Sequence, residues 1–288
     1  MADENLTGAK KGTILTTFST ASATGKTLLS INMASELARI GAKVCLMDLD
    51  LQFGDVCNYL QIMPERAIAT MQKNLDDIGE KYSIEEFVVP YGFNGTIFYL
   101  VPAPLKLAEA YNMSEKAIKV ILQKLQRSYE YIVVDTASMF SVLNLMLLDE
   151  STIVSFLGVV DFVPTIKNMK IGMDTLRSLN YDRNKLRLVL NRSDAKTHIP
   201  MKDVERLLGS PFDYILPNDF RAANISIKTG VPMVLEDENT RLGNSLRTLV
   251  ARYTNRNIEV YDSHFDDEEV KEEKKEEKSG GWFSRFFG

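Results

Sequence analysis

The residues best suited to chemistry form one short loop near the start of the chain. In order, they are Ser22, Ala23, Thr24, Gly25, Lys26 and Thr27. The backbone N–H groups of such a loop, followed by the N-terminus of a helix, can bind phosphate, and the Lys26 ammonium adds a positive charge. A threonine hydroxyl at the position of Thr27 can bind Mg²⁺ beside phosphates. The loop therefore predicts a site for a phosphate-bearing ligand.

Acidic residues follow two apolar segments farther along the chain. The apolar run 43–47 is followed by Asp48, Leu49 and Asp50, and the apolar run 131–134 is followed by Asp135. Continuous apolar runs are typical of central strands in a parallel sheet, and the carboxyl ends of such strands face a ligand-binding crevice. We therefore expect Asp135 to hold Mg²⁺ through water, since this ion keeps several waters. Helix capping or a solvated turn is the alternative role for these carboxylates.

The elements that must position these side chains can be read from hydrophobic patterning. Runs of strand length lie at 13–18, 43–47, 95–101, 131–134, 152–157 and 186–190, and helical segments at 28–40, 114–127 and 164–179. The loop thus lies between an expected strand and an expected apolar helix. Strands that alternate with helices predict an α/β fold with a mostly parallel sheet and helices on both faces.

Composition and charge exclude several classes of protein. The 288 residues carry a net charge of −5, and the segment 262–278 holds four lysines and nine acids (4 − 9 = −5), so the remainder is neutral. A neutral core without a basic stripe makes DNA an unlikely partner. Cys45 and Cys57 form no disulfide or metal-binding pattern. No apolar run is long enough to span a bilayer and the first residues are polar, so we expect a cytoplasmic protein.

Four segments together resemble the MinD/ParA group of deviant P-loop ATPases, over roughly residues 11–252. They are segments 47–56, 131–136, 188–192 and 215–222. Asp-Leu-Gln-Phe-Gly-Asp, at residues 50–55, is the most specific stretch, and it is most similar to the CpaE/TadZ pilus-assembly ATPases. The resemblance implies a P-loop NTPase fold, ATP and Mg²⁺ as ligands, and a homodimer that forms around ATP.

The resemblance also implies a role for individual residues. The loop from Ser22 to Leu28 would bind the phosphates. Asp50 would orient the attacking water, and Lys26, Asp50 and Asp135 would be the catalytic residues. Thr27, Asp50 and Asp135 would form the metal site. Three further residues would flank the adenine, namely Asn191, Arg192 and Pro217.

Two departures from the family pattern concern the loop. Ala21 stands where the family has a signature lysine that reaches the phosphates of the partner subunit, and Ser22 and Ala23 stand where it has glycines. Any residue supplies a backbone N–H, but a non-glycine residue in the left-handed region costs about 1–2 kcal/mol. Because an arginine-finger-type charge is worth about 10³–10⁵ in rate, we expect nucleotide binding with slow hydrolysis.

The end of the chain has its own pattern. Along a helix, four aromatic residues share one face while Ser284 and Arg285 lie opposite; the residues of this tail are Trp282, Phe283, Arg285, Phe286 and Phe287. Such a short helix is typical of a membrane interface, and docking into a groove of a partner protein is the alternative. We expect a flexible N-terminus (1–10), an ATPase domain (11–255), an acidic linker (256–279) and this amphipathic tail (280–288).

These expectations combine into a functional hypothesis. We expect an ATP-dependent homodimer that is peripheral to the inner face of the plasma membrane, with a cell pole as one option for its position, and that positions a membrane-associated machine. Tad-type pilus assembly is the favoured process. The alternatives are a MinD/FlhG-like regulator of division-site or flagellar placement, and an ATP-locked scaffold without turnover. The partners would be pilus-assembly or other polar proteins and the membrane surface.

Overall fold

The computed structural model describes residues 11–79, 83–193, 199–236 and 239–256. The chain divides into two units, residues 1–258 and 259–288, and all described residues belong to the first. Within them, one sheet contains β1 (Thr13–Phe18), β2 (Val44–Leu49), β3 (Val89–Phe93), β4 (Thr96–Val101), β5 (Tyr131–Thr136), β6 (Ile153–Val159), β7 (Leu186–Asn191) and β8 (Tyr214–Ile215).

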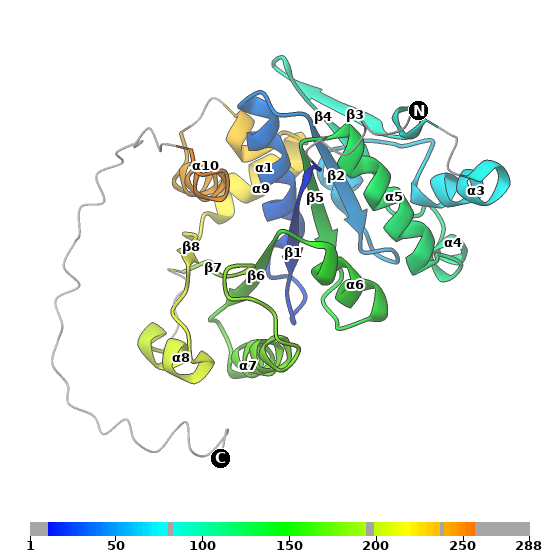
Figure 1. The fold of residues 1–288 in the computed structure, drawn as a ribbon. Coiled ribbons are helices and arrows are strands. Elements are labelled where there is room, and N and C mark those ends of the chain that lie inside the picture. The colour runs from blue at the N-terminus through cyan, green and yellow to red at the C-terminus, as the bar shows by residue number, and fades with distance from the viewer. Residues whose placement is uncertain (1–10, 80–82, 194–198, 237–238, 257–288) are drawn as a thin grey trace, which may run out of the picture. The chain divides into compact units, whose positions relative to one another are not determined.

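The strand order is β3-β4-β2-β5-β1-β6-β7-β8 (Figure 1). All neighbouring strands are parallel except β3 and β4, which form an antiparallel pair at one edge. The central position of β1, between β5 and β6, places the loop that follows it in the middle of the sheet's carboxyl edge. Ligands of open α/β sheets bind at this edge.

Helices cover both faces of the sheet (Figure 1). They are α1 (Lys26–Arg39), α2 (Val56–Tyr59), α3 (Ile68–Ile78), α4 (Leu107–Tyr111), α5 (Glu115–Ser128), α6 (Val142–Glu150), α7 (Val163–Ser178), α8 (Met201–Leu208), α9 (Phe220–Thr229) and α10 (Arg241–Tyr253), with the 3-10 turns η2 (Ile84–Glu86) and η3 (Met233–Leu235). No helix among the described residues is both long enough and apolar enough to cross a membrane.

Strand β1 is buried against helices on both faces of the sheet. Leu15 belongs to the buried cluster that contains the α1 side chains, whereas Ile14 and Phe18 belong to clusters formed with α5 and α7. Successive strand side chains point to opposite faces, so both faces of β1 are buried; its buried hydroxyls on Thr16 and Thr17 bond to the Ser151 and Ser30 hydroxyls. The expected α/β fold is confirmed.

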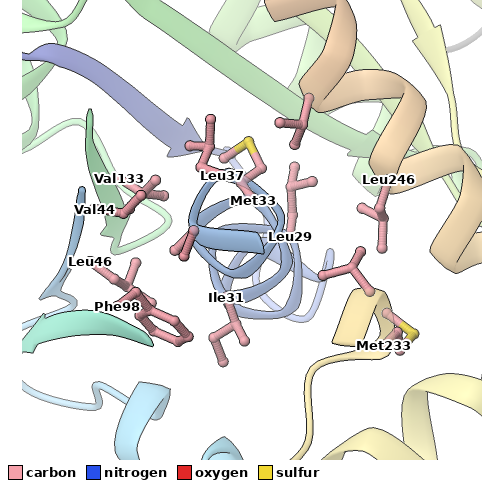
Figure 2. Close-up of a cluster of buried hydrophobic side chains, with 14 of the residues drawn as sticks. Leu29, Ile31, Met33, Leu37, Val44, Leu46, Phe98, Val133, Met233 and Leu246 are labelled. Atoms are coloured by element: carbon pink, nitrogen blue, oxygen red, sulfur yellow. The ribbon is translucent and has the colours of Figure 1, made fainter. Parts of the chain in front are cut away.

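Helix α1 is held in the core of one face (Figure 2). Leu29, Met33 and Leu37 are buried between the sheet, where Val44 and Phe98 lie, and the segment formed by η3 and α10. Burial of a side chain of this size contributes about 1.5–3 kcal/mol. The helix that begins with Lys26 therefore has little freedom to shift.

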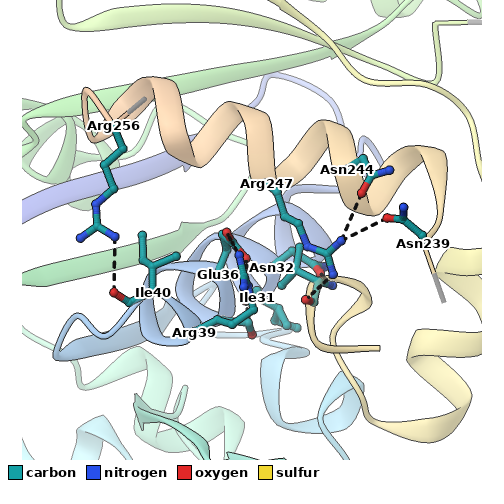
Figure 3. Close-up of polar contacts among 11 residues, drawn as sticks. Ile31, Asn32, Glu36, Arg39, Ile40, Asn239, Asn244, Arg247 and Arg256 are labelled. Atoms are coloured by element: carbon teal, nitrogen blue, oxygen red, sulfur yellow. Dashed lines mark hydrogen bonds and ion pairs between the residues drawn. The ribbon is translucent and has the colours of Figure 1, made fainter. Parts of the chain in front are cut away.

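Polar contacts fix α1 against the last helix (Figure 3). The Asn32 Oδ1 atom accepts a hydrogen bond of 3.1 Å from the Val234 N–H group. Arg247 donates a hydrogen bond of 2.8 Å to the Val234 carbonyl. At the C-terminal end of α1, Arg256 donates to the carbonyl of the C-cap residue Ile40 at 3.4 Å. These contacts tie α10 to both halves of the helix that carries Lys26.

The structure differs from the sequence-based expectation in two places, of which the first affects the site. Strands β2 and β5 run two residues farther than their apolar runs, so Asp48 and Asp135 lie inside the strands and not beyond them. The strands extend because β2 and β5 pair with each other through Asp48–Asp135 and Leu49–Thr136, and both carboxylates are buried there with hydrogen-bond partners. In addition, the antiparallel edge strand β3 has no counterpart in the expected pattern.

Candidate functional site

The phosphate-type loop connects β1 to α1 and leaves the helix N-terminus open. Gly25 is the N-cap residue, with φ of 96°, and no described side chain caps the helix by a hydrogen bond. The first N–H groups of a helix lack partners within the helix, and the helix dipole favours an anion at this end. An open helix N-terminus of this kind is what an anion site requires, and anion binding at this loop stays a prediction.

The glycine-poor part of the loop adopts a strained conformation. Ala23 has φ of 57°, in the left-handed region where a residue with a Cβ atom costs about 1–2 kcal/mol. Ser22 and Ala23 are exposed, whereas Thr24 is buried. The loop therefore keeps its turn although Ser22 and Ala23 replace glycines, and contacts with other residues must offset the strain at Ala23.

Lys26 is almost fully buried and is engaged by a residue that the sequence-based reasoning missed. Its Nζ donates a hydrogen bond of 2.6 Å to the Ser138 hydroxyl, which in turn donates to the Ala21 carbonyl at 2.9 Å. Burial lowers the pKa of Lys26, and the Asp135 and Asp50 carboxylates oppose that shift. The position of Ser138, three residues after Asp135 at the same strand end, is the signal that could have identified it.

Asp135 lies at the centre of a set of hydroxyl groups. Its Oδ1 atom accepts hydrogen bonds of 3.2 Å from Thr17 and from Ser30, and its carboxylate also accepts one from Thr27. The β1–β5 register places Thr17 directly beside Asp135. Burial raises the pKa of Asp135, while these hydroxyls and Lys26 oppose the shift. The two predicted metal residues Thr27 and Asp135 are thus in direct contact.

The two aspartates of β2 have different environments. Asp48 is 2% exposed and pairs in register with Asp135, and it accepts backbone hydrogen bonds from Val56 at 3.1 Å and Asp50 at 3.3 Å. It therefore holds the start of α2, which is the capping alternative noted above. Burial raises its pKa well above the usual range, and the Asp135 charge adds to this. Asp50 is half-buried and faces the crevice.

A cavity of about 470 Å³ opens beside the loop. Polar groups of Ser22, Asp50 and Ser138 line one part of it, while the remainder is largely apolar and includes Phe53 and Met139. The predicted water-orienting residue Asp50 and the new residue Ser138 therefore share one chamber with the loop. This chamber can hold a polar reacting group against an apolar wall.

The three residues expected at the adenine lie on the other side of the loop. Asn191, the last residue of β7, donates to the Thr24 carbonyl at 2.8 Å, and Arg192 donates to the Ala23 carbonyl at 3.1 Å. Pro217 is buried next to Leu216, whose carbonyl accepts a hydrogen bond from Ser193. Leu28, at the end of the loop, is half-buried against the α1 cluster.

The predicted site residues therefore divide into three groups, of which the residues expected at the adenine are described above. The loop, Lys26, Thr27, Asp50 and Asp135 come together at the carboxyl edge of the sheet, while the tail residues 280–288 lie outside the described residues. Over the described ranges, no three His, Cys, Asp or Glu side chains cluster as a metal site. An ion here would have to use Thr27, a carboxylate and ligand phosphates. That donor set is oxygen only and suits Mg²⁺.

Comparisons with known proteins agree with this geometry. The family described as "AAA domain" matches residues 14–171, more than half of the chain. The septum site-determining protein MinD of Thermotoga maritima is 24% identical over 250 residues, which cover 84% of this chain and 88% of that protein.

Two solved structures show the same fold. A ParA family ATPase from Chlorobium tepidum matches with a TM-score of 0.75 and 17% identity, covering 84% of this chain and 98% of the other. MinD from Pyrococcus horikoshii, solved with Mg-ADP, matches with a TM-score of 0.69 and 16% identity, covering 84% and 96%. With the loop, Lys26 and Asp135 in place, the chain belongs to the MinD/ParA-type family of P-loop ATPases.

Proposed function

We propose that this protein binds ATP with Mg²⁺ at the loop between β1 and α1 and hydrolyses it slowly. The observation that carries the proposal is the convergence of Lys26, Thr27 and Asp135 at one open helix N-terminus. The loop N–H groups and Lys26 would bind the phosphates, and Thr27 and Asp135 would hold the ion, which neutralises phosphate charge. Asp50, close enough to Lys26 to affect its pKa, would orient the attacking water.

Slow turnover follows from Ala21. This residue offers a methyl group where the family has a signature lysine, and its carbonyl is already bonded to Ser138. Without that charge we expect turnover well below the roughly 1–100 s⁻¹ of kinases. Asp50→Ala would then lengthen the lifetime of the ATP-bound state. Rapid cooperative hydrolysis by the wild type would contradict this part of the proposal.

The protein would form a homodimer through the carboxyl edge of the sheet. Large apolar side chains are exposed in the segments that follow β2, β4, β5, β6 and β8: Phe53, Tyr111, Met139, Val142, Phe162 and Phe220. Exposed apolar side chains that gather in one region indicate an interaction surface. ATP bound among them would complete that surface.

A matched pair of substitutions tests the dimer. Phe162, 67% exposed, precedes α7 at the carboxyl edge, and Leu179, 49% exposed, follows the same helix at its opposite end. Phe162→Ser should weaken ATP-dependent dimerisation in light scattering after size-exclusion chromatography, and Leu179→Ser should not. Equal dimerisation of both variants and the wild type would exclude this surface.

The cellular role that we favour is positioning of a membrane-associated machine, with Tad-type pilus assembly first because segment 47–56 resembles the CpaE/TadZ proteins. A MinD-like regulator of division-site or flagellar placement is the second candidate, favoured by the similarity to MinD over 84% of the chain. An ATP-locked scaffold is favoured by Ala21. A measurement of steady-state ATP hydrolysis distinguishes the scaffold, which would show no turnover, from the other two roles. The identity of the proteins that bind the Asp50→Ala variant in the presence of ATP distinguishes the pilus role from the division-site role.

Attachment to the inner face of the plasma membrane would use the aromatic tail. One tail of four partly inserted aromatics would bind marginally, comparable to a single acyl chain, whereas two tails on a dimer would gain about 10²–10⁴-fold by avidity. Liposome co-sedimentation should therefore increase with ATP and disappear in a variant that ends at Gly281. Equal pelleting of the shortened and full-length proteins would eliminate the membrane role and favour docking on a protein.

A further inference from the structure

Two side chains from the end of β7 bind consecutive carbonyls of the phosphate loop. The Asn191 Nδ2 atom donates to the Thr24 carbonyl at 2.8 Å, and an Arg192 Nη atom donates to the Ala23 carbonyl at 3.1 Å. These residues are separated from the loop by more than 160 positions in the sequence. The loop is therefore connected to a different part of the sheet at the point where its backbone is strained.

The orientation of the Asn191 side chain is determined on both sides. Its Oδ1 atom accepts a hydrogen bond of 3.0 Å from the Arg192 N–H group, which leaves Nδ2 to donate to the loop. A Cβ atom added to Gly25 would lie 2.6 Å from this Nδ2 atom, so Asn191 packs directly on the glycine. Arg192 itself has φ of 56°, a second non-glycine residue in the left-handed region.

These bonds set the direction of the loop's N–H groups. In a planar trans peptide the C=O and the following N–H point in opposite directions. With the Ala23 and Thr24 carbonyls bonded toward β7, the N–H groups of Thr24 and Gly25 are directed away from it. A carbonyl that turned toward a bound phosphate would repel its oxygens, and the two bonds prevent this.

We infer that Asn191 and Arg192 are positioning residues that hold the glycine-poor phosphate loop in its binding conformation. The inference rests on the proposed binding of nucleotide phosphates at this loop. It differs from the role that the family resemblance implies, in which both residues flank the adenine. A ligand that has phosphates but no base distinguishes the positioning role from the adenine-flanking role.

Inorganic tripolyphosphate with Mg²⁺ is that ligand, measured by calorimetry beside Mg-ATP. Asn191→Ala is the decisive variant because it changes no charge, whereas loss of the Arg192 cation would weaken any polyanion. Removal of one hydrogen bond should weaken both ligands by roughly 3–10-fold. If Asn191→Ala weakens ATP alone, or neither ligand, the positioning role is wrong.

A second measurement needs no ligand. Amide hydrogen exchange of residues 22–27 in the free protein should accelerate by roughly 3–10-fold in Asn191→Ala, since a loop that loses a fixing bond opens more often. Gln126→Ala is the matched control: it removes a 3.0 Å bond from a side-chain amide to the Gly12 carbonyl, before β1, and should leave exchange in the loop unchanged. Unchanged exchange of residues 22–27 in Asn191→Ala would overturn the inference.

Lys26→Ala distinguishes this inference from the proposed function. If Lys26→Ala leaves ATP and tripolyphosphate binding intact, the phosphate site itself is misplaced and the proposed function fails. If Lys26→Ala abolishes binding while Asn191→Ala affects ATP alone, the phosphate site is retained and only the positioning role is rejected.

Discussion

Substitution of Gly25 by alanine should disable the loop while leaving the fold largely intact. Gly25 has φ of 96°, and an added Cβ atom would lie 2.6 Å from Asn191 Nδ2. The backbone strain is worth about 1–2 kcal/mol, and displacement of Asn191 from the Thr24 carbonyl adds about 0.5–1.5 kcal/mol. The free loop can relieve part of this strain by changing its conformation, because Ser22 and Ala23 are exposed.

Binding of ATP must then restore the strained conformation, so the strain and the lost hydrogen bond both reduce the free energy of binding. The combined cost of about 1.5–3.5 kcal/mol corresponds to affinity for Mg-ATP that is about 10–300-fold weaker. Calorimetry measures it directly, with thermal unfolding as the check on the fold. Gly41→Ala is a matched control, since Gly41 follows the other end of α1 with φ of 92° and nothing lies within 4 Å of an added Cβ. Gly41→Ala should lower stability without changing affinity; ATP affinity within threefold of wild type in Gly25→Ala would refute the reasoning.

Two further substitutions test the carboxylates and the missing lysine. Burial raises the pKa of Asp48 in the folded protein, so the folded state holds this proton more tightly than the unfolded state. The free energy of unfolding should therefore fall as pH rises above the usual carboxyl range, and the fall should be shallower in Asp48→Asn; equal slopes in urea unfolding across pH would contradict this. Ala21→Lys should raise steady-state ATP turnover at least tenfold by restoring a cation beside the phosphates, and unchanged turnover would show that another group already supplies that charge.

The general fold could be predicted from the sequence because central parallel strands are apolar on both faces. Strand β1 coincides with its apolar run, and α1 begins two residues earlier than its apolar segment, at Lys26. The antiparallel strand β3 was missed, since its sequence Val-Pro-Tyr-Gly-Phe contains proline and glycine, which are uncommon in strands. Its pairing with β4 provides the ordering that its sequence does not indicate.

The residue types of the site could be predicted, but their hydrogen bonds could not. Lys26, Thr27 and Asp135 follow from the loop and the strand ends. Ser138 and Asn191 contact the loop from distant positions in the chain, 112 residues from Lys26 and 167 from Thr24 respectively. Such contacts depend on the strand order, with β5 and β6 on either side of β1, and no local pattern encodes that order.

The central claim is that Lys26 and its loop form the binding site for the phosphates of Mg-ATP. Isothermal titration calorimetry of the full chain and of Lys26→Ala, each with Mg-ATP, tests it most directly. The account predicts saturable binding by the wild type and none by a folded Lys26→Ala variant, because the Lys26 ammonium would lie among the phosphates of the bound ligand. Equal affinity of the two proteins for Mg-ATP would contradict it.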